Sequence, residues 1–77
     1  MEDRVKRMVE EHKALVEKIV KLNDFVYSEK SDKVDKIEFA NCAIQLSAMK
    51  KYAEALQARL FNVGIIYEDG SYLQHIA

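Results

Sequence analysis

One line of residues in the second half of the chain combines small side chains with a flat ring and cations. Its members are three or four positions apart: Gln45, Ala48, Tyr52, Ala55 and Arg59. Residues at that spacing share one side of a helix, and Lys51 lies beside them. A tyrosine ring can stack on a base, and an arginine fork matches a phosphate. The pattern predicts either a small-anion site or a packed seam between protomers.

No group of residues predicts catalysis. The two histidines, His12 and His75, stand apart in the sequence, and there is no HExxH spacing and no glycine-rich phosphate loop. The single cysteine, Cys42, cannot form an internal disulfide or a cysteine zinc site, and we interpret it as a small core residue. We therefore expect no enzyme activity, no catalytic residue, no metal site and no cofactor.

The helix that carries these residues is apolar around most of its circumference. Its main seam follows a 3-4-3-4 spacing through Phe39, Cys42, Leu46, Met49, Ala53, Leu56, Leu60 and Val63. A further side adds Ile37, Ala40, Ile44 and Ala58. A two-helix hairpin needs only one apolar face, so this helix is expected to have more than one neighbour. The sequence therefore predicts a homo-oligomer.

The first helix has one apolar stripe and one charged face. The stripe keeps a heptad through Val5, Met8, His12, Leu15, Ile19, Leu22 and Val26. His12 occupies a seam position, where an interface histidine is expected. Within the first sixty residues, residues 27–34 form the only polar break, and Asp35 with Glu38 is typical of a helix-capping box. We predict helices over about residues 2–28 and 35–62, ended by Gly64.

The short connection makes the two helices antiparallel, so residues 1–64 are expected to form a coiled-coil-like helical hairpin. The remaining segment, residues 65–77, differs in kind, because short apolar runs flank Asp69-Gly70, a strong two-residue turn signal. An isolated two-stranded hairpin is marginal in water. The fold class is therefore all-α, with a short C-terminal β-hairpin or docked tail.

Composition narrows the class of function. Seventy-seven residues with a net charge of −1 form one small domain without the basic field that nucleic-acid polymers attract. Cations of the first helix alternate with carboxylates, so DNA or RNA binding is not expected. No apolar run approaches the ~20 residues that span a bilayer, and the first residues lack a signal-peptide core. We expect a cytoplasmic protein, in a host bacterial cell, that does not bind membranes.

Several of these residues also form a recognisable pattern. In the first helix they are Leu15, Lys18, Ile19, Lys21, Leu22, Phe25 and Ser28, and in the second Gln45, Leu46, Ala48, Met49, Tyr52, Leu56, Arg59 and Leu60. This pattern, over about residues 8–60, resembles small helical-hairpin proteins of tailed phages, including a family related to crAss-like phages.

A more distant similarity concerns the run from Tyr52 to Arg59. It resembles the second helix of anti-CBASS phage sponges and the hairpin part of certain anti-Thoeris sponges, although tyrosine replaces the usual tryptophan. Those proteins oligomerise and sequester cyclic oligonucleotides or ADP-ribose derivatives without cleaving them. The resemblance implies that Arg59 meets phosphate, that Tyr52 stacks on a base or packs at the pocket wall, and that Lys51 and Gln45 line the site.

Two hypotheses of different class follow. The first is a phage anti-defence protein that binds and sequesters a nucleotide immune signal without cleaving it. The alternative is a helical protein–protein interaction module that blocks or caps a host or phage protein, through an exposed face or the segment around Tyr67 and Tyr72. A shift of the melting temperature by nucleotides distinguishes them, since only the first hypothesis predicts one.

Overall fold

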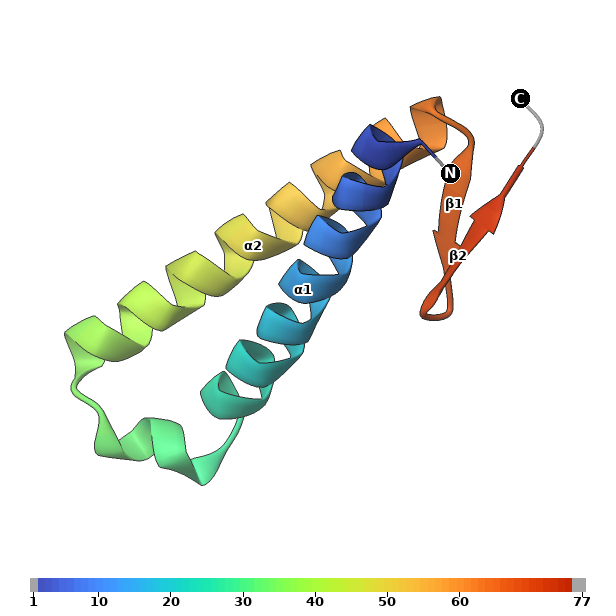
Figure 1. Ribbon diagram of the computed structural model, residues 1–77. Coiled ribbons are helices and arrows are strands. Elements are labelled where there is room, and N and C mark those ends of the chain that lie inside the picture. The colour runs from blue at the N-terminus through green and yellow to red at the C-terminus, as the bar shows by residue number, and fades with distance from the viewer. Residues whose placement is uncertain (1, 76–77) are drawn as a thin grey trace.

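Two long antiparallel helices carry a small antiparallel sheet at the end of the molecule where the first helix begins and the second helix ends (Figure 1). The computed structural model describes residues 2–75. The elements are α1 (Asp3–Val26), a 3₁₀ helix η1 (Glu29–Lys33), α2 (Lys36–Asn62), β1 (Ile65–Glu68) and β2 (Ser71–Gln74). The predicted helical hairpin with a terminal β-hairpin is confirmed. Self-association stays a prediction, and residues 76–77 of the predicted tail lie outside the described part of the chain.

The connection between the helices is ordered by serine and aspartate side chains. The Ser28 hydroxyl donates to the carbonyl of Phe25 at 2.8 Å and accepts from the amide of Lys30 at 3.2 Å. At the start of α2 a carboxylate oxygen of Asp35 accepts from the amide of Glu38 at 2.7 Å, as the capping pattern predicts. These bonds give the helix ends partners for amides and carbonyls that have none within the helices.

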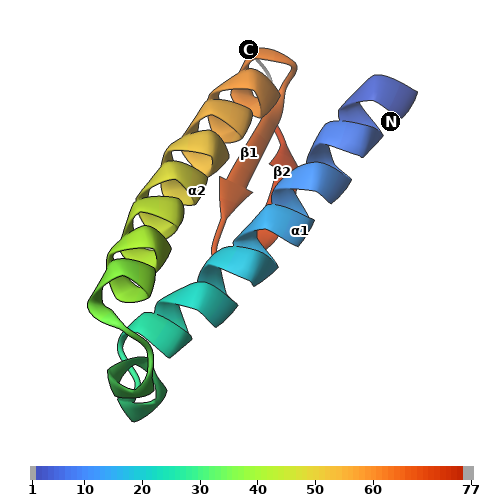
Figure 2. The same cartoon turned by 90° about the vertical axis from the view of Figure 1, so that its left-hand side faces the viewer.

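The two helices cross at an angle instead of remaining side by side over their whole length. In Figure 1 the ribbons of α1 and α2 part toward η1. In Figure 2, turned by 90°, they part at the opposite end, and the β-hairpin is seen behind that gap, on the side of α1 where Figure 1 shows it. The β-hairpin therefore covers one face of the helix pair at that end, and η1 connects the helices at the other end. The molecule measures 47 × 19 × 18 Å.

The core follows the seam between the helices and thins out toward η1. One cluster joins Val5, Met8, Leu60 and Ile65. A second cluster joins Leu15, Ala53 and Leu56. The predicted seam of α2 is buried through its middle, but Phe39 at its start is 38% exposed, because the helices have parted there. On α1, Leu22 and Phe25 are likewise only half-buried.

The β-hairpin turns at the predicted dipeptide. Asp69 has φ 49° and Gly70 has φ 80°, and a type I′ turn requires positive φ at both central residues. In the register of the sheet Tyr67 is paired with Tyr72, so both rings project from the same face. Upstream, Gly64 ends α2 with φ 93°, a conformation that an L side chain rarely adopts.

The β-hairpin docks on the helices through apolar and aromatic contacts. Ile65 is 3% exposed within the cluster formed with Val5, Met8 and Leu60, and Tyr72 packs against it. The amide of His75 donates to the carbonyl of Gly64 at 2.9 Å, which closes the open end of the sheet. Among the helices of the described chain, none is long and apolar enough to cross a membrane.

Candidate functional site

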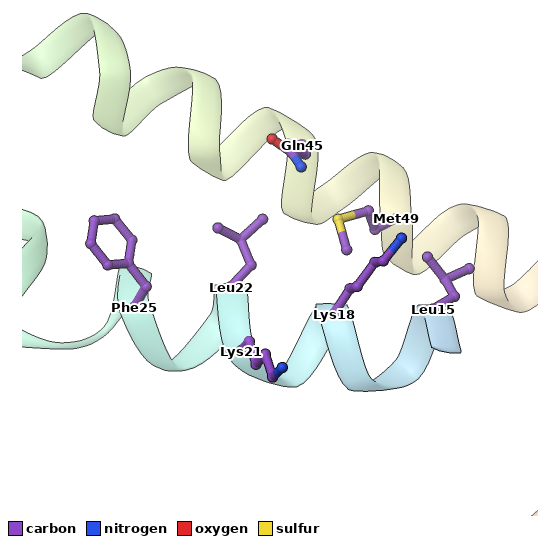
Figure 3. A pocket seen from close by; sticks show the side chains of 7 residues that line it. All are labelled: Leu15, Lys18, Lys21, Leu22, Phe25, Gln45 and Met49. Atoms are coloured by element: carbon purple, nitrogen blue, oxygen red, sulfur yellow. The ribbon is translucent and has the colours of Figure 1, made fainter. Parts of the chain in front are cut away.

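An open groove lies between α1 and α2 where the core thins. It has a volume of about 550 Å³, within the range of small-molecule sites. Its lining consists of Leu15, Lys18, Lys21, Leu22, Phe25, Gln45 and Met49 (Figure 3). Because α1 supplies five of these seven residues and α2 supplies two, the groove depends on how far the helices part.

The side chains divide into an apolar floor and a polar edge. Figure 3 shows Leu22 and Phe25 pointing from α1 toward α2, with Met49 opposite and Lys18 reaching toward Met49. Lys21 lies along α1, and Gln45 projects from α2. A flat apolar group can pack against Phe25 and Met49, while the lysine ammonium groups and the Gln45 amide can bind polar atoms at the edge.

The charged side chains that line the groove are all positive. None of the residues that line it carries a carboxylate, and Lys18 and Lys21 carry positive charge. A neighbouring hollow shares Lys21 and Phe25 and adds Lys30 and a single carboxylate, Asp24. A ligand that suits this surface has a flat apolar part and a negative group, since each would meet its complement.

Arg59 faces a different hollow, toward the other end of the molecule. That hollow has a volume of about 490 Å³ and is lined by Arg4, Met8, Ala58, Arg59, Asn62 and Val63. Both charged residues in its lining are arginines, one from each helix. The Nε atom of Arg4 lies 4.0 Å from a carboxylate oxygen of Glu2, and both side chains are 68% exposed, so this ion pair is weak.

The four sequence-predicted ligand residues do not all gather at one place. Gln45 lines the groove, and Arg59 lines the second hollow, about 21 Å farther along α2 at 1.5 Å per residue. Tyr52 is 46% exposed and lies midway between them, and Lys51 is exposed. Tyr52 and Lys51 line neither of these hollows.

Sequence reasoning missed the contribution of α1 to both hollows. Lys18, Lys21 and Phe25 matched the phage pattern, but nothing in their spacing indicated a groove. The sequence pattern assigns Arg4 no role in ligand binding. Placing the polar and charged residues on two antiparallel helices would have indicated this contribution of α1. Lys18 and Gln45 share one hollow, and Arg4 and Arg59 share the other.

Neither hollow presents a set of metal ligands. Within residues 2–75, no three histidine, cysteine, aspartate or glutamate side chains are grouped so that they could hold a metal ion. The groups available for binding are therefore ammonium and guanidinium cations, amides and apolar side chains.

Fold and groove together define a small helical-hairpin protein with a cation-edged groove and an appended β-hairpin. The family model of Sequestin matches residues 2–62. The chain belongs to the Sequestin family. This membership fits the predicted resemblance to small phage proteins that sequester nucleotides. The narrower resemblance to crAss-like phage proteins stays a prediction.

The family match ends at Asn62, which is also the last residue of α2. It therefore covers both long helices and both hollows apart from Val63, and the β-hairpin lies beyond it. No curated protein and no solved structure shows significant similarity to the chain.

Proposed function

We propose that the protein binds and sequesters a small nucleotide immune signal, a cyclic oligonucleotide or an ADP-ribose derivative, without cleaving it, and so counters a host defence. The observation that carries the proposal is the groove between α1 and α2, with an apolar floor, two lysines, one amide and no carboxylate in its lining. Membership of a family named for sequestration supports the same role.

A nucleotide suits each part of this groove. Its base is a flat π-system that stacks on aromatic side chains, and Phe25 offers such a ring. Its phosphate is an anion that charge-assisted hydrogen bonds from Lys18 and Lys21 would hold. The Gln45 amide supplies both donors and an acceptor, which could read the polar edge of a base.

Thermal unfolding with and without ligand tests the proposal. The purified protein is screened against cyclic di- and trinucleotides and ADP-ribose derivatives, and ligand released by heating is examined by chromatography. A ligand present at 100 times its dissociation constant adds about 2.7 kcal/mol of stability, which is several degrees for a chain of this size. Intact ligand in the released fraction supports sequestration, altered ligand indicates an enzyme, and no shift across the panel contradicts the proposal.

Paired lysine variants locate the site. K18A/K21A removes both groove ammonium groups and is expected to weaken binding by about tenfold or more for each lost contact. K6A/K13A is the matched control, since it removes two exposed lysines of the same helix that line neither hollow. Equal affinities of the two double variants would exclude the groove as the ligand site.

Arg59 and Tyr52 are the alternative ligand contacts. Arg59 lines the second hollow, and Tyr52 lies midway between the two hollows. If the phosphate is held by Arg59 together with Arg4, R59A abolishes binding while K18A/K21A does not. The helical circular dichroism of R59A is expected to equal that of the parent protein, because Arg59 is exposed. If R59A changes the oligomeric mass instead, Arg59 belongs to a seam between protomers.

We also propose that the protein self-associates through the outer face of α2. Ile37 is 76% exposed and Ile44 is 67% exposed on the side of α2 that faces away from α1. Ala40, Ala48 and Ala55 are also exposed along this face, and such small residues allow another helix to approach closely. Light scattering tests this: I44R is expected to reduce the molar mass, and V20R, at an exposed position of α1, is not. Equal masses of I44R and the parent protein would contradict the proposed face.

The same exposed face supports a second function, that of a helical interaction module. In that case a host or phage protein covers Ile37 and Ile44, and no nucleotide changes the melting temperature. Nucleotide-dependent stabilisation that K18A/K21A removes and I44R retains would favour sequestration over this alternative.

A further inference from the structure

The β-hairpin closes over a buried histidine that has only one hydrogen bond. His12 of α1 is 1% exposed. Its Nδ1 atom lies 2.7 Å from the hydroxyl oxygen of Tyr72 on β2. Its Nε2 atom is buried and has no hydrogen-bond partner among the described residues. An unpartnered buried nitrogen is uncommon in folded proteins and needs an explanation.

Aromatic rings of both strands enclose this imidazole. The Tyr67 ring centroid lies 4.6 Å from that of His12, and the Tyr72 centroid lies 5.6 Å from it, both edge-on. The two tyrosine centroids are 5.0 Å apart. Since Tyr67 is on β1 and Tyr72 is on β2, His12 contacts the sheet through both of its strands, and undocking the β-hairpin would expose it.

Neutral imidazole is compatible with this site in either tautomer. If Nε2 carries the proton, the Tyr72 hydroxyl donates to Nδ1; if Nδ1 carries it, Nδ1–H donates to the Tyr72 oxygen. A second proton gives the imidazole a positive charge. Only the arrangement in which Nδ1–H donates to the Tyr72 oxygen then remains, and Nε2 becomes a buried N–H donor without a partner. Burying such a charge without a partner is far more costly than burying the neutral ring.

No nearby element supplies a compensating carboxylate. The titratable groups in contact with the ring are the phenols Tyr67 and Tyr72. On α1 the adjacent Glu11 and Lys13 are exposed, and on β1 Glu68 is exposed. The charged residues of the facing segment of α2 are also exposed, and these are Glu54 and Arg59. Burial is accordingly what lowers the pKa of His12.

We propose that the β-hairpin is a proton-sensitive latch, which is closed over neutral His12 and opens when this imidazole takes up a second proton. The partner hydroxyl does not titrate in the same range, because burial first and the nearby Tyr67 second raise the pKa of Tyr72. The latch is therefore controlled by one group.

Opening is expected to leave the helix pair intact. Two strands of four residues are marginally stable alone, so the β-hairpin depends on its docking. The cluster of Leu15, Ala53 and Leu56 contains no strand residue and holds α1 to α2 without it. Lys18 and Phe25 of the groove lie roughly 120–140° around α1 from His12 at 3.6 residues per turn, so the latch and the groove are separate.

The direction of the pH dependence follows from the lowered pKa. With the β-hairpin undocked, His12 titrates near its ordinary value of about 6.5. Docking is therefore strongest above that pH. It weakens as the pH falls toward the lowered pKa of the docked state, by up to about tenfold in the docking equilibrium per pH unit.

Hydrogen exchange and imidazole titration test the latch on the complete chain. Long-range ¹H–¹⁵N spectra from pH 8.5 to 4.5 follow both histidine rings, and His12 is expected to titrate below 6.5. The reporter amide is that of His75, which donates to Gly64, and the comparison amide is that of Leu56 in α2. After correction for intrinsic rates, His75 is expected to lose protection on acidification while Leu56 keeps it.

Two histidine variants complete the design. H12L, which fills the site with an apolar side chain, is expected to abolish the pH dependence of His75 exchange. The control H75N removes the other histidine, whose ring stacks on Phe61. Exchange is then read at the amide of Leu73, which pairs with Ile66 two positions from the Gly64–His75 pair and so belongs to the next hydrogen-bonded pair of the ladder. The pH dependence is expected to remain.

Three results would each overturn the latch: a His12 ring that titrates at or above 6.5, parallel loss of protection at His75 and Leu56, or an unchanged pH dependence in H12L. The first is measured on the parent protein, so the test stands even if H12L fails to fold.

Discussion

The hydroxyl oxygen of Tyr72 lies 2.7 Å from Nδ1 of His12, across sixty positions of sequence. This contact ties the last strand to the middle of the first helix. It places the polar ends of both side chains inside the interface between the β-hairpin and the helix pair.

Removing the Tyr72 hydroxyl should destabilise the protein although the ring remains. In Y72F both nitrogens of His12 are buried without a partner, which costs about 1–3 kcal/mol. At roughly 4–8 °C per kcal/mol, the midpoint of thermal unfolding at pH 8 is expected to fall measurably. Y27F is the matched control, because Tyr27 is 80% exposed. Equal midpoints for Y72F and Y27F would show that this hydrogen bond contributes nothing.

The cap of α2 should contribute a separate increment of stability. The Asp35 carboxylate accepts from the amide of Glu38 at 2.7 Å, and D35A removes this bond at a cost of about 1 kcal/mol. D32A removes a carboxylate of equal charge from the exposed surface of η1 and serves as control. Urea unfolding followed by circular dichroism measures the difference. A larger loss in D32A than in D35A would contradict the capping role.

Cys42 should be a slow nucleophile that speeds up when Glu38 is neutralised. Burial raises the pKa of the Cys42 thiol, and so do the hydrogen bond to Glu38 and the negative charge of that carboxylate. A raised pKa means less thiolate at pH 8. E38Q is expected to increase the alkylation rate at pH 8, because it removes the negative charge that helps to raise the pKa of this thiol. A slower reaction in E38Q than in the parent protein would refute this explanation.

Phe25 should matter for ligand binding more than for folding. If a base stacks on its half-buried ring, F25A weakens nucleotide affinity by about 1–3 kcal/mol. F61A is the matched control, because Phe61 is 58% exposed and lines neither hollow. Isothermal titration measures both variants. An affinity of F25A equal to that of F61A would place the base elsewhere.

The elements of the fold could be predicted because each has a local cause. The 3-4 spacing produced the buried seam through Leu46, Ala53 and Leu56, and the Asp69-Gly70 pair produced the turn with positive φ at both residues. Asp35 acts as a cap for a reason contained within four residues. In each case the residues that determine the element lie within a few positions of one another in the sequence.

The candidate site could be predicted only in part, because it depends on how the helices cross. Periodicity assigns Phe39 to the seam but cannot show that the helices part before reaching it. The groove of Lys18, Phe25 and Gln45 exists only because of that parting. The contact of His12 with Tyr72 likewise requires the direction in which the chain leaves Gly64, which no local pattern encodes.

The end of the family match at the last residue of α2 makes the β-hairpin a candidate for transplantation. Gly64 connects the β-hairpin closely to the end of α2. Its strands carry Tyr67 and Tyr72, but the ring that these tyrosines contact, His12, is on α1. Grafted onto another helical hairpin, residues 63–75 would meet an unsuited surface unless the recipient also received a histidine at the position of His12 and the apolar residues against which Ile65 packs. The β-hairpin and these helical residues form a unit of exchange, although two thirds of the chain separates His12 from the strands.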